Sequence, residues 1–71
     1  MERIKELRKE LHLTQLQVQM KTGIDQSDYS KIERGIHYPT VEQLISLSCL
    51  LGTSVDYLLN LTDERNPYPR K

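Results

Sequence analysis

The sequence has few of the residues that cross-link very small domains or that build aromatic cores. Its single cysteine, Cys49, excludes an internal disulfide, and the spacing of its two histidines, His12 and His37, does not suit a metal. We therefore expect neither a metal nor a cofactor. Tryptophan and phenylalanine are absent from the 71 residues, so the core must be built from leucine and isoleucine, with four tyrosines.

Long apolar runs and an excess of one charge are also missing. No run approaches the length of a membrane span, and the N-terminus, MERIKELRKE, is charged and periodic, unlike a signal peptide. We expect a cytoplasmic protein with no membrane partner. Ten basic residues balance ten acidic ones, so net charge argues neither for nor against a nucleic-acid partner.

Apolar residues recur at helical spacing, interrupted by residues that begin and end helices. The predicted helices cover residues 2–11, 14–22, 26–34, 41–51 and 55–60, and glycines close three of them. The sequence therefore predicts an all-α fold, a compact five-helix domain over residues 1–61. A flexible tail over 62–71 is expected, because its two prolines disfavour helix in the residues before them.

The stretch LQVQM, residues 16–20, alternates apolar and polar residues as a half-buried strand does. Three helix-start signals oppose a strand. Thr14 can cap a helix, Gln17 completes a capping box, and Leu13 and Val18 are placed to form a hydrophobic staple. We therefore predict a helix and treat the alternation as accidental.

Two short helices meet almost directly at Gly23, and such a tight connection predicts a steep crossing, as in a helix-turn-helix. The second helix, about 25–34, has Tyr29 and Ile32 on its inward side. Amide, hydroxyl and ammonium groups that can read base edges in the major groove lie on the other side, at Gln26, Ser27, Ser30 and Lys31. Its N-terminus should also offer free N–H groups to phosphates.

These features resemble the phage repressor/Cro-type helix-turn-helix domains, also called the xenobiotic-response-element family of bacterial regulators. The likeness covers about residues 3–60 without a gap. The matching segments are IKELRKE, LTQ, Gly23-Ile24, Gln26-Ser27, Ser30 to Gly35, Pro39 to Glu42, Leu47 to Gly52 and Ser54 to Leu59.

The resemblance implies roles for particular residues. Gln15 would contact a phosphate, and Arg34 and the loop residues 36–38 would lie along the DNA backbone. An ion pair between Arg8 and Glu33 would pin the first helix to the recognition helix. The implied DNA-binding set is Gln15, Gln26, Ser27, Asp28, Ser30, Lys31, Arg34 and His37.

The chain departs from the family pattern in its second helix. Gln19 stands where the family usually has alanine, and Thr22 where it has an apolar residue. Leu16 and Met20 stand where the family is usually polar, which explains the odd alternation. We expect these two side chains to form an exposed apolar strip that meets a partner chain or a repacked first helix.

Charge is a second departure from a typical DNA-binding surface. Between residues 14 and 38, three acidic residues cancel the basic Lys21, Lys31 and Arg34. Asp28 is the least expected of them, although a carboxylate can accept a hydrogen bond from cytosine. One such domain should bind DNA weakly, so we expect a homodimer on two half-sites about 34 Å apart.

The residues support two functions. The first is a sequence-specific regulator of transcription that binds double-stranded DNA, a bacterial or phage repressor without a small-molecule effector. The second is a protein-interaction module on the same fold, such as an antitoxin or anti-repressor partner. An enzyme is not expected, since no catalytic constellation of Ser, His and Asp and no phosphate loop occurs.

Overall fold

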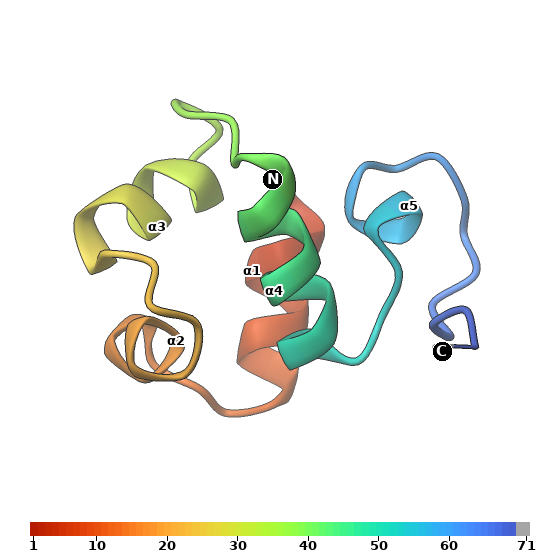
Figure 1. The fold of residues 1–71 in the computed structure, drawn as a ribbon, viewed down its shortest axis with the longest axis horizontal. Helices are drawn as coiled ribbons and strands as arrows, with labels where there is room; N and C mark the ends of the chain where they lie inside the picture. The colour runs from red at the N-terminus through yellow and green to blue at the C-terminus, as the bar shows by residue number, and fades with distance from the viewer. Residues whose placement is uncertain (70–71) are drawn as a thin grey trace.

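The computed structural model describes residues 1–69 and contains, within that range, five α-helices and no strand. They are α1 (Glu2–Glu10), α2 (Gln15–Thr22), α3 (Gln26–Glu33), α4 (Val41–Leu51) and α5 (Val55–Leu58). The predicted all-α, five-helix fold is therefore confirmed. Figure 1 shows α1 and α4 packed together in the middle, with α2 and α3 at one end and α5 at the other. None of the described helices is long and apolar enough to cross a membrane.

Hydroxyl side chains cap the starts of α2, α4 and α5. The Thr14 hydroxyl accepts the N–H of Gln17 at 3.1 Å, and the Gln17 side chain accepts the N–H of Thr14 at 2.8 Å. Thr40 and Gln43 form the same reciprocal box at the start of α4, and Ser54 caps α5. These bonds satisfy backbone donors that have no partner inside a helix, which confirms the predicted capping.

The alternating stretch LQVQM lies inside α2, as the start signals predicted. Only Val18 of its apolar residues is fully buried. Leu16 is 52% exposed and Met20 77% exposed, so one flank of the helix carries an apolar strip that its own domain does not cover. Burial of both side chains inside the domain would have excluded an exposed apolar strip, and neither is buried. Contact of the strip with a partner chain stays a prediction.

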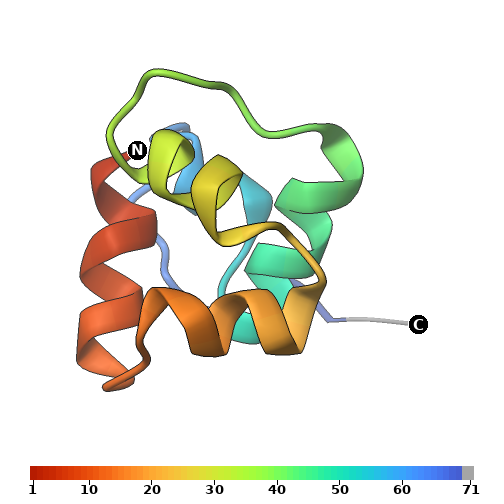
Figure 2. The same cartoon turned by 90° about the vertical axis from the view of Figure 1, so that its left-hand side faces the viewer.

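The core draws on every helix, and its buried area is the main source of stability. It comprises Ile4, Leu7, Val18, Ile24, Tyr29, Ile32, Leu47, Leu51 and Leu58. In Figure 2, α2 and α3 face the viewer, with α1 at the left and α4 at the right; α3 packs against α1, and α2 packs against α4. This arrangement fixes α3 on a rigid base while leaving its outer flank open.

The segment after α5 runs along the side of the molecule away from α2 and α3 (Figure 1). Arg3 Nη1 donates to the Thr62 carbonyl at 2.6 Å, and the Thr53 hydroxyl donates to the Arg65 carbonyl at 2.6 Å. The segment has no helix in its described part, and these bonds attach it to the domain. Its flexibility stays a prediction, and residues 70–71 lie outside the described residues.

Candidate nucleic-acid interface

The turn between α2 and α3 depends on Gly23. This residue has φ 78° and ψ 0°, a left-handed conformation that strains residues with a side chain. Its N–H donates to the Gln19 carbonyl at 2.8 Å, which ends α2. Asp25 then begins α3, because its carboxylate accepts the N–H of Ser27 at 3.0 Å. The connection between the two helices is therefore as short as predicted.

Both unusual polar residues of α2 find partners in this turn. Gln19 Oε1 accepts the backbone N–H of Gln26 at 2.7 Å. The oxygen end of the Gln19 amide must face Gln26, because the NH₂ end can only donate. The Thr22 hydroxyl donates to the Val18 carbonyl at 2.7 Å and accepts the N–H of Ile24 at 3.2 Å. These substitutions therefore bury no unpaired group at the α2–α3 contact.

The N-terminus of α3 is more occupied than the sequence predicted. Gln19 holds the N–H of Gln26, and Asp25 holds the N–H of Ser27. The expectation that these groups are free for phosphates is wrong for these two donors. For Gln26 the physical reason is a cap supplied from another helix, which a local pattern does not display, and for Ser27 it is the N-cap Asp25 two residues earlier.

The outer flank of α3 is polar and open to solvent, whereas Tyr29 and Ile32 are fully buried on its inner side. Exposed on that flank or at its end are Gln26, Ser27, Asp28, Lys31 and Arg34, while Ser30 is half-buried. This is the arrangement that a helix reading a groove requires. Contact of each residue with DNA stays a prediction.

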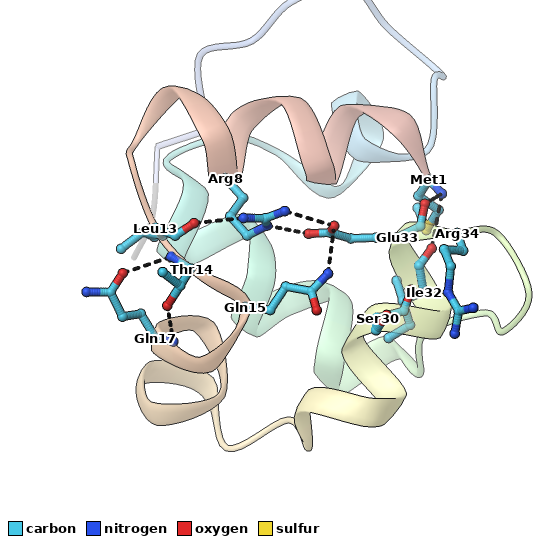
Figure 3. A network of polar contacts seen from close by, with 10 residues as sticks. All are labelled: Met1, Arg8, Leu13, Thr14, Gln15, Gln17, Ser30, Ile32, Glu33 and Arg34. Carbon is cyan, nitrogen blue, oxygen red and sulfur yellow. Dashed lines mark hydrogen bonds and ion pairs between the residues drawn. The ribbon is translucent and has the colours of Figure 1, made fainter.

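Three helices meet at one carboxylate (Figure 3). Arg8 of α1 donates to Glu33 of α3 from Nε at 2.6 Å and from Nη2 at 3.1 Å. Gln15 of α2 donates to the same carboxylate at 3.2 Å, and Arg8 Nη1 donates to the Leu13 carbonyl at 2.8 Å. The side chains of Arg8 and Glu33 are only 12% and 3% exposed. The ion pair implied by the resemblance is thus present, and Gln15 joins it.

Burial and hydrogen bonding act in opposite directions on this cluster. Burial favours the neutral form of Glu33, but bonds from Arg8 and Gln15 and the nearby Tyr29 hydroxyl outweigh it and lower the Glu33 pKa. The bond to Glu33 raises the pKa of Arg8. Burial is the main cause that raises the pKa of Tyr29, and the neighbouring Glu33 carboxylate raises it further, so the Tyr29 hydroxyl stays neutral. Within the described residues, the Tyr29 oxygen has no partner of good hydrogen-bond geometry.

A groove of about 520 Å³ lies where α1, α2 and α3 meet. We call it the α1–α3 groove, lined by Glu2, Lys5, Lys9, Gln15, Ser30 and Arg34 together with the Arg8–Glu33 pair. It brings together three predicted DNA-binding residues, Gln15, Ser30 and Arg34, with two lysines of α1, Lys5 and Lys9, that the predicted set does not contain. Their spacing of four residues, which places both on one helix face, is the signal that could have found them.

His37 lies apart from these residues. It belongs to the loop between α3 and α4, is exposed, and does not line the α1–α3 groove. Its neighbours Ile36 and Tyr38 are 66% and 86% exposed. The loop is therefore accessible, as a backbone contact would require, but the structure does not bring it together with Gln15 and Ser30.

A glycine-hinged helix pair that rests on α1 and α4, with a polar second helix facing outward, defines a helix-turn-helix protein. The chain belongs to the helix-turn-helix family, whose model matches residues 4–58. The resemblance to phage repressor/Cro-type domains is thereby confirmed.

Relatives and a solved structure agree with this assignment. The chain is 39% identical to the uncharacterized HTH-type transcriptional regulator YobD of Bacillus subtilis, over 93% of this chain and 59% of YobD. It is 37% identical to the cryptic phage CTXphi transcriptional repressor RstR of Vibrio cholerae, over 89% of this chain and 58% of RstR. It thus spans less than two thirds of either relative. The N-terminal DNA-binding domain of SinR from Bacillus subtilis superposes with a TM-score of 0.78 at 35% identity, covering 87% of this chain and 91% of that one.

Proposed function

We propose that the chain is a sequence-specific DNA-binding regulator of transcription that acts as a repressor by placing α3 in the major groove. The observation that carries the proposal is the exposed polar flank of α3, held by a buried ion pair and a rigid core. Gln26 and Lys31 offer the donors that read adenine and guanine, and Asp28 can accept from cytosine. Gln15, Arg34 and His37 would position the domain on phosphates.

We further propose that the protein works in the cytoplasm as a homodimer and needs no small-molecule effector. Two copies would compensate for the weak binding of one domain and would read two half-sites about one helical turn apart. Support for a partner comes from exposed apolar residues on α4, since Val41 is 72% and Ile45 48% exposed. The interaction-module alternative is less favoured, because the relatives are named as regulators and the similar structure as a DNA-binding domain.

Selection of a preferred duplex from a random pool, followed by variants, tests the proposal. Lys31→Ala and Gln26→Ala should each cost about 1–3 kcal/mol of binding and relax base preference at one position. Lys21→Ala, which removes an exposed lysine of α2, is the matched control and should preserve that preference. Titration of the selected duplex with the wild-type chain should give a stoichiometry of two chains on each full site.

One outcome would overturn the regulator proposal. If the folded chain retards no duplex at low salt, where phosphate contacts bind most tightly, the protein does not bind DNA. An interaction module would behave in this way.

A further inference from the structure

We propose that the α1–α3 groove is a binding site for the phosphodiester backbone of DNA, in which Lys5 and Lys9 of α1 hold the phosphates. This site would extend the contact beyond α3 and its flanking loop. The inference rests on the proposed function, because it presumes a duplex along α3.

The two lysines have the position and freedom that the site requires. They lie one helical turn apart on α1 and both line the groove. Lys5 is half-buried and Lys9 exposed, so both can be reached from solvent. Neither makes an ion pair with any residue from 1 to 69. Their ammonium groups are therefore available to an anion from outside the protein.

The charge of the groove also favours an anion. Arg8 is held on Glu33 by two hydrogen bonds, so those two charges compensate each other. Among the lining side chains this leaves Lys5, Lys9 and Arg34 against the single carboxylate of Glu2. Charges cancel within residues 14–38, but the fold brings Lys5 and Lys9 of α1 next to this segment. The local charge at the groove is therefore more positive than that count indicates.

The groove is continuous with the flank that would read bases. Ser30 and Arg34 belong to the recognition helix or its end, and Gln15 opens α2, yet all three line the groove with the lysines. A backbone that passes Gln15 and Arg34 therefore passes Lys5 and Lys9. Lysine suits this role because its charge is attracted to phosphate without needing a fixed geometry.

The test measures affinity for random-sequence duplexes over a series of salt concentrations, by fluorescence anisotropy with the full 71-residue chain. A phosphate contact contributes about 0.9 to the slope of log affinity against log salt. The double variant K5Q/K9Q should therefore lower the slope by about 2, and K5R/K9R should keep it. Glu2→Gln should instead strengthen binding, since it removes the opposing carboxylate.

Lys21→Gln is the control for the effect of one lysine charge elsewhere, because it neutralises an exposed lysine outside the groove and should lower the slope by less than either lysine of the groove does. If K5Q/K9Q folds and has the same slope as the wild type, the groove site is wrong while the DNA-binding proposal stands. If the wild type binds no duplex, the proposed function and this site both fall. Thermal unfolding of each variant shows whether a lost slope reflects a lost fold.

Discussion

Glu33 is the residue on which the support of the recognition helix converges. Its side chain is 3% exposed and receives bonds from α1 and α2, so it ties three helices together. A buried ion pair adds little net stability over a well-packed apolar pair, but removing one partner leaves an uncompensated charge. The role of Glu33 is therefore to fix how α3 sits on α1, which matters more for a reading surface than for stability.

We predict that Glu33→Gln lowers the free energy of unfolding by about 3 kcal/mol at neutral pH, because Arg8 loses its counter-charge. Urea unfolding measures it. Glu10→Gln is the matched control: it breaks the pair with Arg65, whose side chains are 54% and 52% exposed, and should change little. Equal losses in both variants would contradict the buried-pair account.

The same residue predicts a pH dependence. Because the folded state lowers the Glu33 pKa, the ion pair contributes stability above the unfolded pKa of about 4.3. That stability should decline as the pH falls from about 4.3 through the lower folded pKa. Glu33→Gln should remove this part of the acid sensitivity, as urea unfolding at several pH values would show. A wild-type profile parallel to that of the variant would argue against it.

Between elements, the contact that distinguishes this helix-turn-helix is the hydrogen bond that the backbone N–H of Gln26 donates to the Gln19 side chain. Alanine, usual at this position in the family that the sequence resembles, has no acceptor for the first N–H of α3. Here α2 supplies one at 2.7 Å, so the start of the recognition helix is attached directly to its neighbour. Gln19 is thus a positioning residue for Gln26, whose side chain we propose reads a base.

We predict that Gln19→Ala speeds hydrogen exchange at the Gln26 amide and lowers stability by about 1 kcal/mol, the usual effect of losing a cap. Base preference at the position read by Gln26 should weaken more than overall affinity. Gln17→Ala, which removes a cap of the same chemistry at the start of α2, is the control and should leave Gln26 exchange unchanged. Slow Gln26 exchange in Gln19→Ala would show that the cap is dispensable.

At the scale of the whole molecule, the cations of the α1–α3 groove and the contacts that attach the segment after α5 lie in different parts of the structure. The α1–α3 groove is lined from α1, α2 and the end of α3. The segment after α5 lies at the end of the molecule opposite to α2 and α3 (Figure 1). Formal neutrality of the chain therefore does not describe the α1–α3 groove, where Lys5, Lys9 and Arg34 stand against the single carboxylate of Glu2. At the proposed phosphate site, association depends on the local surplus of Lys5, Lys9 and Arg34 and not on the sum over all residues.

We predict that a chain ending at Leu61 is less stable than the full chain by about 1 kcal/mol or more, because Thr53 loses the acceptor of a buried hydroxyl. Thr53 is 1% exposed and donates to the Arg65 carbonyl, while Arg3 pairs with Asp63. Urea unfolding compares the two, with a chain ending at Pro69 as control. Equal stability of all three would favour the flexible tail expected from composition.

Much of the fold and part of the candidate site could be predicted from the sequence. Thr14, Gly23 and Thr40 mark helix ends because caps form between residues no more than a few positions apart. The inward positions of Tyr29 and Ile32, and hence the polar flank opposite them, follow from helical periodicity. A count of charges along residues 14–38 does not include Lys5 and Lys9, whereas the groove brings them from α1 next to residues of α2 and α3.

The sequence by itself determined that the chain is five short helices with a glycine hinge and a polar recognition flank, since capping and periodicity are local properties. Only the tertiary structure decided that Gln19 caps α3, that Gln15 shares Glu33 with Arg8, and that α1 adds cations to the interface. Each of these contacts joins residues on different helices. Their distance and direction depend on how helices cross, which packing of the whole core sets.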